Sequence, residues 1–338
     1  MKKIVMQLLA DSLGLSRVTV WKVLNDRPGV APETVQRVQE AVNRLQKENE
    51  EEGDGDSELL FQQTVKSITL LVARADTSSF WRRIVDQIAS ELNQRQIQLN
   101  YIPIDVMQLS PSDLHSLVQP DKTDGIIVVN VYDRSILSVL STVVTPKIFL
   151  DTIPGYAAAD LNGDLFLLEG KRTVSTITNS LISKGCKKIG FIGDIQYART
   201  NALRWEGFLD GMARSGLTVD SHLCLTKAIG KDDYRDDISA FLEGIRGMPD
   251  AFVCASDYVA FVTLHLLNER GYRVPENLRL SGYDDTKEFL LDHSGIISVH
   301  VQNGLLGKRM IHQLLYRIEN PQTDYEEIQV FPKILYRD

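Results

Sequence analysis

Apolar positions recur at helical spacing through the first part of the chain. Residues 4–13 carry an apolar stripe that ends at Gly14, a residue suited to the C-terminus of a helix. Ser16 follows as a good N-cap for a second helix. A third helix is expected from Pro32, with valines, alanine and leucine on one face. The pattern predicts a three-helix domain over residues 1–47.

The pattern changes twice beyond this head. Residues 48–64 are expected to form an acidic linker, because 48–58 holds seven acids and no aliphatic or aromatic side chain. Across 65–338, short apolar runs alternate with amphipathic stretches. This alternation is typical of a doubly wound α/β fold, and two successive series of strands indicate two lobes.

Charge divides the chain at the same place. The whole chain has a formal net charge of −8, but residues 1–47 carry +4 and the remainder −12. A basic head on an acidic body localises contact with a polyanion to the head. Two helices joined by a tight turn containing glycine are the helix-turn-helix layout of DNA-binding proteins. A three-helix bundle without a nucleic-acid role is the alternative.

The composition and motifs of the chain limit which other classes of protein it can belong to. Cys186, Cys224 and Cys254 lack the spacing of zinc ligands, and we interpret them as reduced core thiols. No dinucleotide fingerprint or phosphate loop is present, so we expect neither an enzyme nor a cofactor or metal. No apolar stretch is long enough to span a membrane, and no export signal is recognisable. A cytoplasmic protein is therefore expected.

The stretch from Leu9 to Leu45 resembles the N-terminus of LacI/GalR-family bacterial regulators, through Ala10, the Gly14-Leu15-Ser16 turn and Val23-Leu24-Asn25. The resemblance implies a regulator that binds double-stranded operator DNA as a homodimer, with repression as the default. Arg17, Val18 and Lys22 would read bases in the major groove. The residues that would hold the DNA backbone are Ser16, Thr19, Trp21, Asn25 and Thr34.

Several segments of the body also match the family, among them RWEGFLDGM at 204–212 and ERGYRVPENLRLSGYDDT at 269–286. Through them the body resembles the family's periplasmic-binding-protein-like core, in which two α/β lobes joined by three crossing strands enclose an effector. The implied lobes are about 65–165 with 298–326, and about 166–297 with 327–338. The resemblance implies that Arg204 and Asp284 are the strongest effector-binding candidates, and their chemistry fits, since a guanidinium and a carboxylate suit hydroxyl groups; a structural ion pair is the alternative. The further candidates are Phe80, Trp81, Asn130, Tyr132, Arg199, Ser256 and Asp257.

The resemblance implies a small effector, most commonly a sugar or sugar derivative, with a purine or a partner protein as the runner-up. A ligand-binding protein of the same core fold without operator function is a further alternative. On the helix after Thr77, an apolar stripe looks exposed and is a candidate surface for dimerisation. It consists of Trp81, Ile84, Val85, Ile88 and Leu92.

The linker departs from the family. Its members carry a short basic hinge helix that inserts leucines into the minor groove, whereas residues 46–54 here hold several acids and neither leucine nor arginine. Carboxylates repel phosphates, so we expect half-sites to be bound without that wedge. The apolar Leu59-Leu60-Phe61 segment is expected to pack on the body or on its dimer mate, with a displaced wedge as the alternative.

Overall fold

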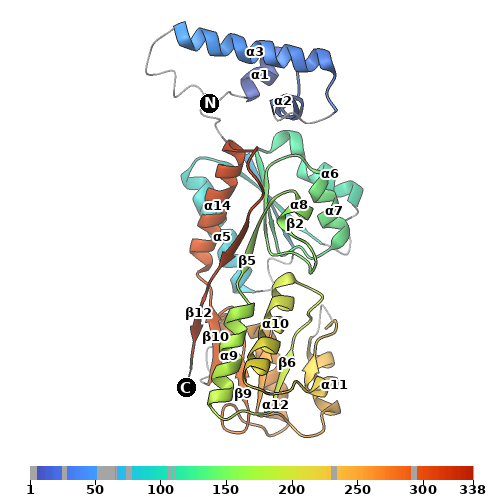
Figure 1. The fold of residues 1–338 in the computed structure, drawn as a ribbon, viewed down its shortest axis with the longest axis vertical. Helices are drawn as coiled ribbons and strands as arrows, with labels where there is room; N and C mark the ends of the chain where they lie inside the picture. Colours follow the sequence, from blue (N-terminus) through green and yellow to red (C-terminus); the bar gives the residue numbers. More distant parts are fainter. Residues whose placement is uncertain are drawn as a thin grey trace.

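The computed structural model describes residues 6–24, 29–51, 65, 67–73, 78–105, 109, 111–229, 234–290 and 295–337. A helical head lies at one end of an elongated body, and the body contains two sheets, each with helices on both faces (Figure 1). The predicted fold class, a helix-turn-helix head with a two-lobed α/β core, is confirmed.

The head contains α1 (Met6–Leu13), α2 (Arg17–Leu24) and α3 (Pro32–Glu51). Gly14 joins the first two with φ of +64°, a conformation that glycine adopts without steric cost. The Ser16 hydroxyl accepts a hydrogen bond from the Thr19 backbone N–H at 3.1 Å, as an N-cap does. The buried residues of the head are Leu9, Ala10, Val20, Val23 and Val38.

The third helix runs beyond residue 47, the predicted end of the head. It continues through the first acidic residues of the expected linker and ends at Glu51. Residues 52–64 lie outside the described part of the chain, and so does the Leu59-Leu60-Phe61 segment.

The first lobe is built on a parallel six-stranded sheet of order β11-β5-β4-β3-β1-β2. Its strands are β1 (Ser67–Ala73), β2 (Gln98–Ile104), β3 (Gly125–Val129), β4 (Lys147–Leu150), β5 (Asp164–Leu168) and β11 (Glu327–Val330). One face packs against α5 (Ser79–Gln94) and α14 (Asn303–Glu319). The other packs against α6 (Pro111–Val118), α7 (Arg134–Thr142) and α8 (Ala158–Leu161). Strands β1, β3, β4 and β5 are almost entirely buried, as a sheet covered on both faces requires.

The second lobe has a sheet of order β12-β10-β9-β8-β6-β7, in which only the β12–β10 pair is antiparallel among the pairs described. Its strands are β6 (Ile189–Ile192), β7 (Cys224–Leu225), β8 (Ala251–Cys254), β9 (Arg279–Ser281), β10 (Ile296–His300) and β12 (Lys333–Leu335). Its helices are α9 (Lys171–Ser183) and α10 (Arg199–Arg214) on one face, α11 (Tyr234–Gly244) and α12 (Asp257–Glu269) on the other, and the short α13 (Lys287–Leu290).

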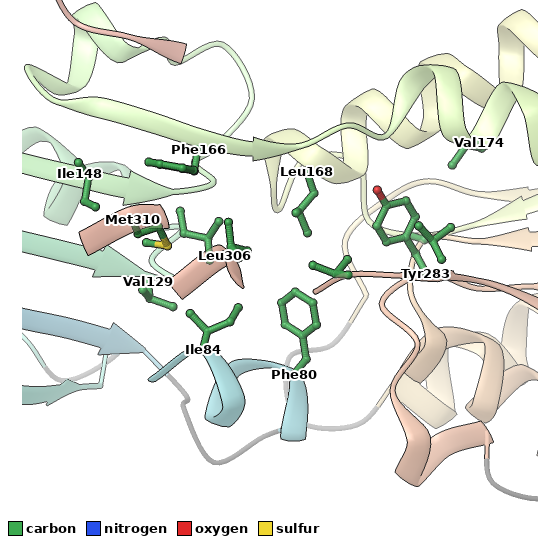
Figure 2. Packing of buried hydrophobic residues seen from close by; sticks show 14 of the residues in the cluster. Phe80, Ile84, Val129, Ile148, Phe166, Leu168, Val174, Tyr283, Leu306 and Met310 are labelled. Carbon is green, nitrogen blue, oxygen red and sulfur yellow. The ribbon is translucent and has the colours of Figure 1, made fainter. Parts of the chain in front are cut away.

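The chain crosses between the lobes after β5, after β10 and after β11. These positions correct the expected lobe limits: residues 166–168 and 327–330 belong to the first sheet, whereas 298–300 belong to the second. The hydrophobic pattern could not locate the crossings, because the buried core continues from one lobe to the other. Figure 2 shows this cluster extending from Ile84, Phe166 and Met310 past Phe80, Leu168 and Leu306 to Val174 and Tyr283.

The apolar stripe on α5 is not an exposed surface. Ile84, Ile88 and Leu92 are fully buried against the first sheet and α14. Trp81 and Val85 are partly buried against the same core. Most of the stripe therefore belongs to the interior of the first lobe, because a helix and a sheet cover it, and the expectation that it is exposed is corrected.

Candidate functional site

A cleft of about 780 Å³ is lined by residues of both lobes. Three of its polar residues follow strands: Asn130 comes after β3, Asp151 after β4 and Asp284 after β9. All three have left-handed backbone conformations, with φ of 59°, 66° and 108°. Such conformations cost roughly 1–3 kcal/mol each and gather at ligand sites. The cleft therefore lies where ligands bind in open α/β sheets, beyond the carboxyl ends of the strands.

Arg204 of α10 lies at the deep end of the cleft and is 5% exposed. Its Nη1 donates to the Ala255 carbonyl at 2.5 Å, its Cζ lies 3.6 Å from the ring centroid of Tyr283, and its Nη2 is 3.7 Å from the Asp284 carboxylate. Gly170 makes room for the arginine stem, because a Cβ there would lie 2.8 Å from Arg204 Cγ. The guanidinium is thus held rigidly, and its Nε has no hydrogen-bond partner within the described residues.

Two carboxyl groups flank this arginine, the buried Asp151 and the partly buried Asp284. Burial raises the pKa of Asp284 to about 6, although Arg204 opposes the shift. Burial also raises the pKa of Asp151, against the effect of its hydrogen bonds with Thr200 and Thr152. Asp151 accepts from the Thr200 hydroxyl at 2.5 Å and from the Tyr132 hydroxyl at 3.2 Å. The deep end therefore offers fixed groups that can exchange hydrogen bonds with hydroxyls.

A second group of side chains lines the more exposed end of the cleft. It consists of Tyr234 and Asp237 from α11, Tyr258 from α12 and Phe289 from α13, and is called the outer aromatic group below. Tyr258 is 38% exposed, in contrast to the buried Arg204. Its ring centroid lies 5.1 Å from those of both Tyr234 and Phe289. The cleft thus combines a buried polar end with an accessible aromatic end.

Most of the predicted effector-binding residues line this cleft. They are Phe80, Trp81, Asn130, Tyr132, Arg204, Ser256 and Asp284. Some also have structural roles: Ser256 caps α12 by accepting from the Val259 N–H at 3.3 Å, and the Asn130 side chain donates to the Ala73 carbonyl at 2.7 Å. Phe80 is largely buried in the core, whereas Trp81 is only partly buried.

Arg199 does not line the cleft, which corrects its assignment. Its guanidinium makes a two-pronged ion pair with Glu327 of β11, at 2.9 and 3.0 Å, and donates to the Tyr156 carbonyl. Because Arg199 begins a helix of the second lobe and Glu327 belongs to the first, this pair joins the lobes beside the cleft.

Asp257 is also absent from the cleft lining. Its carboxylate is fully buried and accepts hydrogen bonds from the Ser298 hydroxyl at 2.7 Å and the Thr286 N–H at 2.8 Å. Burial raises its pKa to about 8, and the nearby Asp284 charge adds to the shift. Asp257 therefore fastens α12 to β10 and the loop after β9. The family resemblance of the segment after the apolar strand at 251–256 had placed it beside the ligand.

Sequence reasoning missed several lining residues. Asp151 could have been found, because it directly follows an apolar run at a predicted strand end, as Asn130 does. Thr200 and Tyr197, near the start of α10, carried no comparable signal. The outer aromatic group had none either, because its members come from three separate helices and meet only in the folded chain.

The two lobes also touch at the rim of the cleft. The Glu288 carboxylate of α13 accepts from the Ser79 N–H at 2.6 Å and also from the Ser79 hydroxyl, and so caps α5. On the side of Asp151, the Arg199 N–H donates to the Thr152 carbonyl at 2.6 Å. The Tyr132 and Tyr197 ring centroids are 4.6 Å apart. The lobes are therefore bonded to each other on both sides of the cleft.

The candidate DNA-reading residues lie on α2 and its flanks. Val18, Thr19, Trp21 and Lys22 are partly exposed, whereas Ser16 is exposed. Arg17 forms an ion pair with the buried Asp124 at the start of β3, so the reading helix contacts the first lobe. Thr34 lies in the first turn of α3, while Asn25 lies outside the described residues. The candidates from Ser16 to Lys22 thus share α2 and the turn before it, and Thr34 belongs to α3.

Two kinds of feature are absent from the described residues. No helix among them is both long and apolar enough to cross a membrane. No group of three or more His, Cys, Asp or Glu side chains there is arranged to hold a metal ion.

Residues 178–338 match the family model of the periplasmic binding protein-like domain. Similar curated proteins match along almost the whole chain: the HTH-type transcriptional repressor PurR of Haemophilus influenzae (strain ATCC 51907 / DSM 11121 / KW20 / Rd) is 25% identical over 97% of this chain and 96% of its own. The solved complex of the transcriptional regulator CelR with cellobiose has a TM-score of 0.71, with 20% identity and 98% of both chains covered. The Lac repressor dimer bound to operator and the anti-inducer ONPF has a TM-score of 0.66, with 18% identity over 97% of this chain and 96% of that chain.

The helical head and the two-lobed, cleft-bearing core together define a transcriptional regulator with a periplasmic-binding-protein-like body. Along almost its whole length the chain is similar to a transcriptional repressor, and its fold is that of the Lac repressor, in agreement with the family resemblance of its sequence.

Proposed function

We propose that this protein is an effector-responsive repressor that binds operator DNA as a homodimer in the cytoplasm. The observation that carries the proposal is the union, in one chain, of a basic helix-turn-helix head and a cleft between two lobes with Arg204 and Asp284 at its deep end. This role requires DNA binding by the head and effector binding in the cleft, and it requires no catalysis.

On the DNA side, Arg17, Val18 and Lys22 would contact base edges. The phosphate backbone of the DNA would be held by Ser16, Thr19, Trp21, Asn25 and Thr34. We propose that the half-sites are bound without a minor-groove wedge, because the linker is acidic where the family hinge is basic. An operator complex with a leucine of this chain intercalated at the dyad would refute that part of the proposal.

On the effector side, the cleft suits a sugar or sugar derivative. Carboxyl, hydroxyl and guanidinium groups exchange hydrogen bonds with hydroxyls, and aromatic rings pack on the C–H faces of a sugar. The similar CelR structure, which is a cellobiose complex, supports a sugar over a purine. A ligand bridging both lobes would shift the balance between lobe arrangements and thereby the relative position of two heads in a dimer.

Two measurements test the proposal. Fluorescence anisotropy with labelled genomic fragments at low salt should find a tightly bound operator. A thermal-shift screen over sugars and nucleosides should find a ligand that raises the melting temperature, because a ligand of the folded state stabilises it. If no fragment binds up to micromolar concentrations, with or without candidate ligands, the regulator function is refuted.

A further inference from the structure

The cleft has a second end that the deep polar site does not explain. Tyr234, Tyr258 and Phe289 form a connected set of rings around the accessible end, with centroids 5.1 Å apart for each neighbouring pair. Asp237 lies three residues after Tyr234 on the same face of α11 and also lines the cleft. Aromatic surface next to a carboxylate offers a stacking platform and a hydrogen-bond acceptor for a hydroxylated ring.

The charge of the cleft limits what can bind. Arg204 is the one cationic side chain among the described residues that line it, whereas Asp151, Asp194, Asp237 and Asp284 are acidic. The guanidinium already contacts Asp284, the Ala255 carbonyl and the Tyr283 ring. Within this described lining, a phosphate group would find little free positive charge and several carboxylates nearby, so these residues favour an uncharged ligand.

The size of the cleft agrees with a ligand that reaches both ends. Pockets for drug-sized ligands span roughly 300–1,000 Å³, and the volume here is about 780 Å³. We propose that the outer aromatic group is a second sugar subsite, and that the effector is an uncharged glycoside of at least two rings. One ring would occupy the Arg204–Asp284 end and the next would lie against Tyr258 and Asp237. This inference rests on the proposed function.

Calorimetry on the full-length protein tests the ligand class, with glucose, glucose 6-phosphate, cellobiose, maltose, lactose and adenosine as probes. At least one disaccharide should bind ten or more times more tightly than glucose, and glucose 6-phosphate should not bind. Glucose or glucose 6-phosphate binding as tightly as every disaccharide would overturn the inference, as would binding of adenosine alone or of no probe.

Variants locate the second ring. Tyr258→Ala and Asp237→Asn should each weaken binding of the disaccharide about tenfold and leave the binding of glucose unchanged, while Tyr316→Ala, an exposed tyrosine of α14 outside the cleft, should change neither. Equal losses for both sugars would refute the subsite. The proposed function fails separately, if operator binding responds to none of the probes; a response to glucose alone would refute only the subsite.

A different observation concerns the rim of the cleft. Glu288 of the second lobe accepts from the backbone and the hydroxyl of Ser79 at the start of α5 in the first lobe. These bonds keep the pKa of Glu288 below its usual range, against the effect of burial. Trp81, two residues further along α5, lines the cleft. We infer that Glu288 and Ser79 form a latch that holds the lobes together at this rim.

The latch can be tested without a ligand. Glu288→Ala should make Trp81 more accessible to acrylamide and increase the Stern–Volmer constant of tryptophan fluorescence. The increase should disappear in a Trp81→Phe background, while Glu243→Ala, which removes an exposed carboxylate of α11, should have no effect. An unchanged constant in Glu288→Ala, or an increase that survives Trp81→Phe, would overturn the latch.

Discussion

The head and the body differ in how much structure supports each function. The head rests on one small cluster around Leu9, Val20 and Val38, and its candidate base-reading side chains are partly exposed residues of α2. In the body, three larger clusters position a cleft whose deep polar groups are buried and bonded to one another. DNA recognition should therefore depend on individual exposed side chains, and effector recognition on a preorganised network.

This difference makes the two functions separable by mutation. A change in the cleft should remove the response and leave DNA binding in place, whereas a change in α2 should do the opposite.

The largest effect is expected from Arg204→Ala. Loss of charge-assisted hydrogen bonds of about 3 kcal/mol should weaken effector binding by about 100-fold or more. Operator affinity without effector should stay within a factor of two or so of wild type, as measured by anisotropy. Arg214→Ala, an exposed arginine at the end of the same helix, is the matched control. An Arg204→Ala protein that still responds normally would show that this arginine does not hold the effector.

Arg17→Ala should weaken operator binding by about 10- to 100-fold, since a base contact by arginine is worth about 1–3 kcal/mol. Arg17→Lys should keep most of the affinity for unrelated DNA and lose preference for the operator, because lysine cannot make the forked contact. Calorimetric effector binding should be unchanged in both. Loss of effector affinity would mean that head and cleft are not separable.

The buried carboxyl groups of the body predict an unusual pH dependence. Asp257 has a pKa of about 8 in the folded protein and about 3.9 when unfolded. The folded state therefore holds a proton that the unfolded state releases, and the free energy of unfolding should increase as pH falls from 8 to 6. The melting temperature should rise by about 2 °C per pH unit. Asp257→Asn should remove most of this slope. An unchanged slope in that variant would assign the pH dependence to other groups.

The smallest effect concerns the contact between head and body. Arg17 must leave its ion pair with Asp124 before it can reach DNA. A partly exposed ion pair contributes about 1 kcal/mol at most, so Asp124→Asn should strengthen operator binding by up to about fivefold. Anisotropy titrations at low and high salt would measure it. In an Arg17→Ala background, Asp124→Asn should have no effect on operator binding. An equal gain in affinity there would show that Asp124 and DNA do not compete for Arg17.

The sequence predicted the architecture well, because strand–helix alternation and the glycine-interrupted helices at the N-terminus are local patterns. It also located Arg204, Asp284, Asn130 and Tyr132 in the cleft, since a family resemblance and strand ends mark them. It placed Arg199 and Asp257 in the cleft as well, although an ion pair holds the first elsewhere and hydrogen bonds from Ser298 and Thr286 hold the second. Partners such as Glu327 lie far away along the chain, so only the folded structure reveals that these charges are already engaged.

The central claim is that one molecule couples the cleft to the head. The most direct test is operator binding by the full-length protein, followed by anisotropy, with and without the ligand found by calorimetry. We predict that the ligand changes operator affinity at least fivefold in the wild type and has no effect in Arg204→Ala, although both proteins bind the operator equally well without ligand. A ligand that binds the wild-type cleft and leaves operator affinity unchanged would contradict the account.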